Sequence, residues 1–161
     1  ENAAKVRRIP NNALVYQVMN DGDVSKIILP VEGKGLWSTL YGFVALETDT
    51  NTISGLTFYE HGETPGLGGE VDNPNWKGLW KGRKLYAVEG DTYTPKIEVI
   101  KGTAGPASAD PYKVDGLSGA TLTSRGVTEL MRFWVGEHGF KSYLANYRAG
   151  SLNDSAPEGG K

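Results

Sequence analysis

Two apolar stretches decide the fold of this chain: Phe43-Val44-Ala45-Leu46-Glu47 and Ile53-Ser54-Gly55-Leu56-Thr57-Phe58-Tyr59. The polar residues 48–52 separate them. Short runs rich in β-branched and aromatic residues on either side of a polar turn are typical of paired strands. The two stretches therefore predict an antiparallel hairpin.

The same pattern occurs on both sides of this hairpin. Residues 14–18 and 24–29 are apolar and flank the turn Asn20-Asp21-Gly22-Asp23, which predicts a second hairpin. Residues 84–88 and 96–100 are two further short strands around a polar loop. Strands joined by short turns indicate a largely antiparallel sheet.

The last third of the sequence changes to a helical period. An apolar stripe at i, i+3, i+4, i+7 and i+8 predicts a helix with a stop at Gly139, and the stripe consists of Val127, Leu130, Met131, Trp134 and Val135. A second, shorter helix that ends near Gly150 is predicted by Phe140, Tyr143, Leu144 and Tyr147.

The chain has 161 residues, which favours one domain. We predict the α+β class, with a mainly antiparallel twisted sheet and the C-terminal helices packed on it. Residues 14–150 form the domain, residues 1–13 an N-terminal segment, and residues 151–161 a flexible tail because they are small, polar and rich in Gly and Pro.

Composition excludes several classes of function. The chain has no cysteine, which removes disulfides, thiolate metal sites and a thiol nucleophile, and its two histidines are too few for an ordinary zinc site. The net charge of -2 gives no attraction for nucleic acid. No apolar run approaches the ~20 residues needed to cross a bilayer. We therefore expect neither a metal nor a nucleic-acid partner.

A glycine-rich loop leads directly into the first predicted helix: Asp115-Gly116-Leu117-Ser118-Gly119-Ala120-Thr121-Leu122-Thr123-Ser124. Its glycines allow close approach of a ligand, and the helix start offers free N–H groups, which suits a phosphate. The alternative is that a Ser or Thr side chain caps the helix while glycine makes the turn. P-loop, dinucleotide-loop and hydrolase-elbow signatures are absent.

A second glycine-rich loop is His61-Gly62-Glu63-Thr64-Pro65-Gly66-Leu67-Gly68-Gly69-Glu70. It suits either a ligand-contacting turn or a type II Pro-Gly turn between a strand and a helix. Trp76, Leu79 and Trp80 follow at helical spacing and are expected in the core. Trp37, among glycines, either covers a flat ring or anchors its own loop.

Both loops carry a resemblance to a known family. The stretch 115–121 resembles the D-G-x-[S/T]-G-A-T pattern of flavinylated proteins, and the stretch 61–68 resembles the second hallmark of the same FMN-binding domain. Residues 33–37 and 71–77 narrow the likeness to NqrC, the subunit of sodium-translocating NADH:quinone reductases that has a soluble FMN-binding domain. The related FMN-binding subunit of Rnf electron-transport complexes is the nearest competitor. The resemblance covers about residues 14–147.

The resemblance implies FMN held through a phosphoester to the Thr121 hydroxyl. A Mg-dependent flavin transferase would supply FMN from FAD and release AMP, so a sample made without the transferase would lack FMN. It further implies a cofactor site built from Ser118, Gly119, Ala120, Leu122, Thr123 and Asp115 on the attachment side and from Glu63, Thr64, Gly66, Leu67, Gly68 and Trp37 on the side of the ring. It implies no catalytic residue in this chain.

The resemblance also implies a setting. The family's subunit has an N-terminal transmembrane helix, absent from this chain, that anchors it in the bacterial inner membrane with its soluble domain on the periplasmic side. Its partners are the other subunits of the redox complex and the flavin transferase. The alternatives are an Rnf subunit, a module that binds a phosphorylated ligand noncovalently or is purely structural, and a stand-alone flavin reductase. The last is disfavoured because no nicotinamide-binding signature is present.

Overall fold

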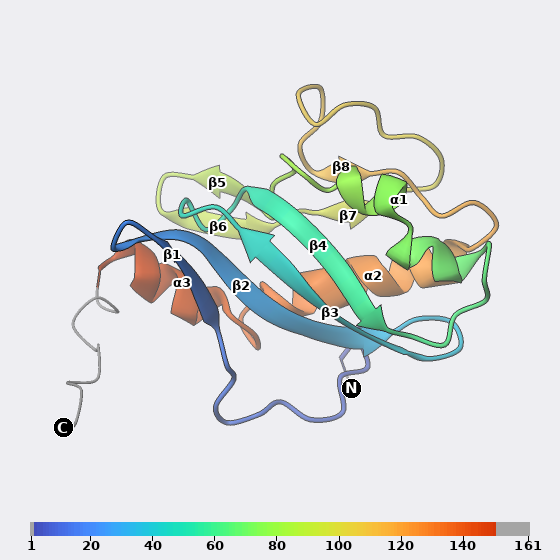
Figure 1. The fold of residues 1–161 in the computed structure, drawn as a ribbon, viewed down its shortest axis with the longest axis horizontal. Helices are drawn as coiled ribbons and strands as arrows, with labels where there is room; N and C mark the ends of the chain where they lie inside the picture. Colours follow the sequence, from blue (N-terminus) through green and yellow to red (C-terminus); the bar gives the residue numbers. More distant parts are fainter. Residues whose placement is uncertain (1, 151–161) are drawn as a thin grey trace.

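A four-stranded antiparallel sheet forms the centre of the computed structural model, which describes residues 2–150 (Figure 1). Its strands follow one another in space as in sequence: β1 (Tyr16–Asn20), β2 (Asp23–Lys34), β3 (Thr39–Leu46) and β4 (Ile53–Glu60). The sheet confirms the predicted class and both predicted hairpins. In the first hairpin Asp21 and Gly22 both have positive φ, 51° and 88°, as a type I′ turn requires.

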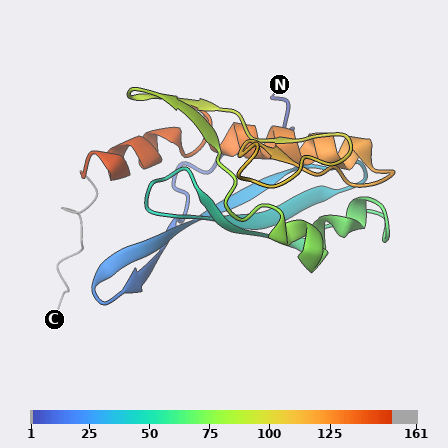
Figure 2. The ribbon, with the colours of Figure 1, turned by 90° about the horizontal axis from the view of Figure 1, so that it is seen from above.

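One face of the sheet is buried and the other is partly exposed. Burial alternates along β2 and β3, so Ile27, Leu29 and Val44 face the core while Ile28 and Phe43 lie on the other face. The helix α2 (Thr121–Trp134) covers the buried face, and the two views together show it crossing behind the strands (Figures 1 and 2). Strand β2 runs five residues past the predicted end at residue 29, because Val31 and Gly33 continue the alternation against this helix.

The prediction for residues 84–100 is wrong in its pairing. Strand β5 (Tyr86–Glu89) pairs instead with β6 (Thr92–Pro95) across a turn in which Gly90 has a φ of 58°. Residues 98–99 form a separate strand, β7 (Glu98–Val99), which pairs in parallel with β8 (Lys113–Val114). The chain turns away between the two pairs because the Lys96 and Ile97 N–H groups both donate to the Leu85 carbonyl.

The helices follow the predicted stripes. Val127, Leu130, Met131, Trp134 and Val135 are all buried, and α3 (Lys141–Arg148) buries Leu144 beside Phe140. Helix α2 ends at Trp134, five residues before Gly139, and the Phe140 N–H returns to the Trp134 carbonyl. The Trp134 indole also donates to the Glu32 carbonyl at 2.7 Å, which ties the end of α2 to β2.

A short helical segment connects β4 to β5. It consists of the 3-10 helix η1 (Gly68–Asp72) and α1 (Pro74–Gly78). Trp76 and Trp80 are buried with their ring centroids 5.6 Å apart, which confirms their predicted place in the core. The Trp76 indole donates to the Asp115 carbonyl at 2.9 Å, so this segment also supports the loop before α2.

Two further predictions concern the C-terminal tail and membrane-spanning segments. The tail predicted at 151–161 lies outside the described residues. Within residues 2–150, no helix combines the length and apolar character that a bilayer span needs.

Candidate functional site

The loop of residues 115–120 joins β8 to α2 and is held close to the end of β7. The Gly116 N–H donates to the Gly102 carbonyl at 2.9 Å, and a side chain at Gly116 would collide with the Ile100 carbonyl. Gly119 has a φ of 67°, which non-glycine residues rarely adopt. The Asp115 carboxylate accepts from the Ala104 N–H at 2.8 Å, so this acid caps a local N–H group and holds the loop.

Thr121 is the first residue of α2, and its side chain is exposed. The position before it is Ala120, which has no side chain able to cap the helix, so the capping interpretation of this loop is wrong. Among residues 2–150, no hydrogen-bond partner exists for the Thr121 hydroxyl or for the N–H groups of residues 121–123. The start of α2 therefore presents a free hydroxyl beside free amide donors.

The neighbouring hydroxyls differ from that of Thr121. The Ser124 hydroxyl accepts from the Leu117 N–H at 3.0 Å and donates to the Ala120 carbonyl at 3.1 Å. Thr123 is buried, and its hydroxyl donates to the Glu63 carboxylate at 2.9 Å. Ser118 is exposed, and its hydroxyl, like that of Thr121, has no partner within the described part of the chain. The structure thus separates two free hydroxyls from two that hold the loop.

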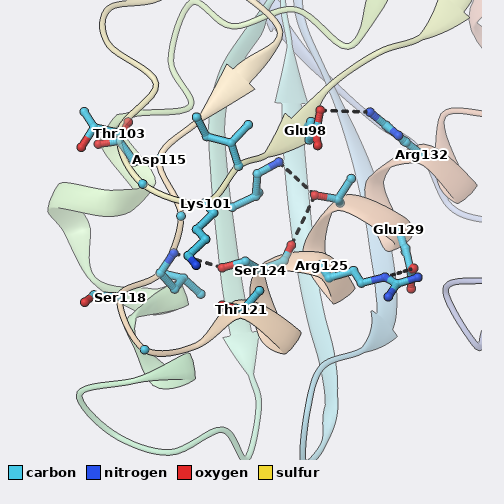
Figure 3. A pocket seen from close by; sticks show the side chains of 17 residues that line it. Glu98, Lys101, Thr103, Asp115, Ser118, Thr121, Ser124, Arg125, Glu129 and Arg132 are labelled. Carbon is cyan, nitrogen blue, oxygen red and sulfur yellow. Dashed lines mark hydrogen bonds and ion pairs between the residues drawn. The ribbon is translucent and has the colours of Figure 1, made fainter.

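Thr121 lies on the wall of a cavity of about 810 Å³ between α2, β7 and the loop of residues 115–119 (Figure 3). This volume is in the usual range for a small-molecule site. Many of the side chains that line it are polar: Glu98, Lys101, Thr103, Asp115, Ser118, Thr121, Ser124, Arg125, Thr128, Glu129 and Arg132.

Sequence reasoning missed most of the charged side chains in this cavity. Arg125, Thr128, Glu129 and Arg132 lie at i, i+3, i+4 and i+7, so they form the polar face of the helix whose apolar stripe was predicted. That spacing could have predicted these four residues from the sequence. No sequence pattern could have predicted Lys101, because its place in the cavity depends on the parallel pairing of β7 with β8.

On the other side of Thr121, the buried carboxylate of Glu63 joins three segments. It accepts hydrogen bonds from the N–H groups of Leu36, Trp37 and Ser38 at 3.2, 3.1 and 3.0 Å. The hydroxyls of Ser38 and Thr123 donate to it at 3.1 and 2.9 Å. We call this group of residues the Glu63 hub: residues 36–38, Glu63 and Thr123.

The hub has an electrostatic consequence. Burial by itself raises the pKa of Glu63, but hydrogen bonds from the Ser38 N–H, the Thr123 hydroxyl and the Trp37 N–H outweigh it. The pKa of Glu63 is therefore lowered from its ordinary value, and the side chain is a carboxylate at neutral pH. A side chain at Gly35 or at Gly68 would collide with this hub, which explains both glycines.

The turn that follows Glu63 is the predicted Pro-Gly turn. The Leu67 N–H donates to the Thr64 carbonyl at 3.1 Å, and Gly66 has a φ of 76°, as a type II turn requires. His61 fixes the start of this loop, since its Nδ1 accepts from the Glu63 N–H at 3.2 Å and its Nε2 contacts the Asp72 carboxylate at 2.7 Å. A type II turn and a ligand-contacting loop are compatible interpretations here, because the turn leaves Leu67 exposed.

Exposed apolar side chains surround this side of Thr121. We call them the apolar rim: Leu36 (38% exposed), Trp37 (68%), Leu67 (43%) and Leu122 (58%). A side chain at Gly119 would lie 3.0 Å from a Leu67 methyl group, so the turn touches the loop before α2. The rim and the cavity are separate surfaces next to the start of α2, because no member of the rim lines the cavity.

The structure thus divides the predicted site residues into three groups. Asp115, Ser118, Gly119 and Thr121 line the cavity. Trp37, Leu67 and Leu122 belong to the rim, with Thr64 and Gly66 exposed in the adjoining turn. Ala120, Thr123, Glu63 and Gly68 are buried behind them and shape the loops rather than offer a surface to a ligand.

The fold and this site define a class of protein, the FMN-binding domain, whose family matches residues 35–136 of the chain. Individual relatives identify a narrower family within that class. The chain is 54% identical over 151 residues to the NqrC protein of the Na(+)-translocating NADH-quinone reductase of Pseudomonas aeruginosa, a match that covers 93% of this chain and 57% of the relative. The corresponding protein of Vibrio parahaemolyticus is 54% identical over 153 residues, with 95% and 57% covered.

Solved structures agree. The crystal structure of Shewanella oneidensis NqrC has a TM-score of 0.85 and 43% identity, and covers 92% of this chain and 67% of that one. The crystal structure of the Parabacteroides distasonis protein has a TM-score of 0.66 and 34% identity, with 81% and 61% covered. The chain belongs to the NqrC family of Na(+)-translocating NADH-quinone reductases. It spans 57% of the length of the two relatives compared above.

Proposed function

We propose that this domain carries FMN covalently, through a phosphoester to the Thr121 hydroxyl, and transfers electrons as part of a Na(+)-translocating NADH-quinone reductase. The family match supports the cofactor, and the names of the relatives support the complex. The attachment to Thr121 is the specific claim, and the hydroxyl groups around the start of α2 are what support it.

The supporting observation is the free, exposed hydroxyl of Thr121. Thr123 is the nearest competitor of the same residue type, but its hydroxyl is buried and donates to Glu63. Ser124 is also buried and bonded on both sides. An acceptor of a phosphoryl group must be reachable and must not be needed elsewhere, so Thr121 is the better acceptor.

The attachment reaction requires no oxidation or reduction. The Thr121 oxygen forms a bond to the FMN-side phosphorus of FAD, the bond from that phosphorus to the bridging pyrophosphate oxygen breaks, and AMP leaves. The threonine proton passes to a base of the flavin transferase. The resulting phosphodiester keeps one negative charge, which the free N–H groups and the dipole at the start of α2 stabilise.

The two sides of Thr121 fit the two parts of FMN. The apolar rim offers Trp37 and Leu67 to a flat, largely apolar ring, and the polar cavity suits a phosphate and a ribityl chain. The Glu63 hub supports the rim from behind, since it holds the backbone of residues 36–38. When bound, FMN supplies the redox chemistry, and the chain's own residues position it and leave it open to partners.

The remainder of the proposal concerns the setting. Electron donors and acceptors would be other subunits of the complex, and FMN would come from a flavin transferase that uses FAD. The complex lies in the bacterial inner membrane, with residues 14–150 as its FMN-binding domain on the periplasmic side and residues 1–13 following an N-terminal membrane helix.

The proposal is tested by intact mass after incubation of the chain with an active flavin transferase, Mg²⁺ and FAD, followed by peptide mapping. The wild-type chain should gain the mass of FMN minus water on the peptide that contains Thr121. Thr121→Ala should gain nothing, and Thr121→Ser should still be modified because it keeps a hydroxyl.

Ser118→Ala is the matched control, because Ser118 has the other free hydroxyl in this loop and should not be needed. Modification of Thr121→Ala at full yield would refute the attachment site. An unmodified wild-type chain, with the transferase active on another substrate, would favour a module that binds its ligand noncovalently.

A further inference from the structure

The charged side chains of the cavity are not equivalent. Arg125 forms an ion pair with Glu129 at 3.0 Å, and Arg132 lies 3.8 Å from Glu98. Lys101 lines the same cavity, yet within residues 2–150 its ammonium group has neither an ion pair nor a hydrogen bond. Of the three cations that line the cavity, Lys101 is therefore the one whose charge the described residues leave unbalanced.

The position of Lys101 is fixed by the backbone on both sides of it. Its neighbour Ile100 donates its N–H to the Val114 carbonyl at 2.9 Å, and Gly102 accepts from the Gly116 N–H at 2.9 Å. The backbone at Lys101 is therefore packed against the loop that leads to Thr121. Figure 3 shows the Lys101 side chain extending from the end of β7 toward the start of α2.

Three acids and three bases line the cavity, and the two ion pairs among them leave out Lys101 and Asp115. The start of α2 adds partial positive charge to the same cavity, and a cation near a helix N-terminus is unfavourable in the absence of an anion. Asp115 is the acid on the loop beside it, but its carboxylate accepts a hydrogen bond from the Ala104 N–H. A bound anion would satisfy both Lys101 and the helix start.

We propose that Lys101 is the counter-charge for the phosphate group of FMN on Thr121. The inference rests on the proposed function, since it takes the phosphodiester to be at Thr121. Lys101 acts as a positioning residue: its ammonium group donates to a phosphate oxygen and directs the nucleotide tail into the cavity, while the ring lies over the apolar rim. Charge-assisted contacts of this kind are short and among the stronger hydrogen bonds.

The test compares Lys101→Gln with Lys101→Arg and with Lys113→Gln. Lys113 is the matched control, because it is an exposed lysine on the neighbouring strand β8, pairs with Asp110 at 3.3 Å and does not line the cavity. Each full chain is loaded with FMN by the flavin transferase to completion, at low salt so that screening is small. The ³¹P NMR resonance of the phosphodiester is then recorded, together with the initial rate of loading.

Lys101→Gln should shift the ³¹P resonance relative to wild type and load about tenfold more slowly, as expected for loss of one charge-assisted hydrogen bond. Lys101→Arg should restore most of the rate, and Lys113→Gln should match wild type in both measurements. An unchanged resonance in Lys101→Gln would overturn the inference, even if loading slowed, because the effect would then lie in recognition by the transferase. A wild-type chain that gains no FMN would instead overturn the proposed function.

Discussion

The two sides of Thr121 are built on opposite principles. On one side the Glu63 side chain is buried, and its carboxylate receives five hydrogen bonds from two other segments, residues 36–38 and Thr123 of α2. On the other side the cavity is lined by exposed charges, of which Lys101 has no partner among the described residues. The first arrangement is complete without a ligand, whereas the second leaves the Lys101 ammonium group available to one.

This difference separates two tasks within one site. Buried, satisfied polar groups fix the geometry of loops, and removing one partner leaves the others unpaired at a high cost in stability. Exposed, unpaired charges contribute little to stability and are available for binding. Substitution of Glu63 should therefore lower the stability of the fold, and substitution of Lys101 should slow FMN loading with the stability unchanged.

The largest effect on stability is expected at Glu63. Glu63→Ala leaves the N–H groups of residues 36–38 without their acceptor, so we expect the free energy of unfolding to fall by about 4 kcal/mol. Urea denaturation followed by circular dichroism measures it. Glu60→Ala, an exposed position at the end of β4, is the control and should change the stability by less than about 0.5 kcal/mol. Equal losses at the two positions would show that the hub has no special role.

The hub should also give the fold a pH dependence. The pKa of Glu63 is lowered from 4.5 in the folded state, so its contribution to stability is fully present above that value and is lost as the pH falls through the lower, folded-state pKa. Glu63→Gln should therefore show a smaller loss of stability than wild type between neutral pH and the acidic side of 4.5. Parallel pH profiles would mean that Glu63 does not titrate differently on folding.

A smaller loss is expected at Gly126, where α2 passes the end of β2. A side chain there would collide with the Lys34 carbonyl and lie 3.2 Å from the Gly35 Cα. Replacing glycine by alanine within a helix normally stabilises by about 1 kcal/mol. At this position the collision reverses the sign, and Gly126→Ala should destabilise by about 2 kcal/mol, as measured by thermal and urea unfolding.

Gly78→Ala provides the comparison for that result. Gly78 lies in α1 with no atom within 4 Å of the position of an added side chain, so the substitution should be neutral or mildly stabilising. Because Gly126 packs against Lys34 and Gly35, directly before residues 36–38 of the hub, Gly126→Ala should also slow FMN loading. Normal loading would show that the two sides of Thr121 are less tightly coupled than their contacts indicate.

The smallest effect on stability is expected at Trp37 in the apolar rim. Its side chain is 68% exposed, so Trp37→Ala should change the free energy of unfolding by less than about 0.5 kcal/mol. In the loaded protein the same substitution should raise flavin fluorescence, because an indole in contact with the ring quenches it. Leu14→Ala, at a position that is 73% exposed just before β1, should leave the fluorescence unchanged. Equal flavin fluorescence in Trp37→Ala and Leu14→Ala would show that the ring does not contact Trp37.

Much of the fold could be predicted from local patterns. The apolar stripe of α2 and the turn at Asp21-Gly22 each depend on residues close together in sequence, and both were predicted correctly. The pairing of β7 with β8 was missed because each strand has only two residues and the partners are separated by a long irregular segment. No period can be detected in two residues.

The site shows the same limit. The loop with Thr121 was visible as glycine and hydroxyl residues before a helix, and the turn at Gly66 was visible as a Pro-Gly pair. The role of Glu63 was not visible in the sequence. Its backbone donors lie 25 to 27 residues before it, and its donor Thr123 lies 60 residues after it. That the Thr123 hydroxyl is occupied while the Thr121 hydroxyl is free follows from this distant contact, and local sequence does not contain that information.

The long-range contacts of the hub have a kinetic consequence. A hydrogen bond between residues 60 apart, like the bond from the Trp134 indole to a carbonyl 102 residues away, forms only after long stretches of chain have been brought together. The start of α2 thus reaches its final geometry late in folding. If Thr121 is the acceptor, an unfolded or misfolded chain would not present it correctly, and attachment of FMN would itself report that the domain has completed its fold.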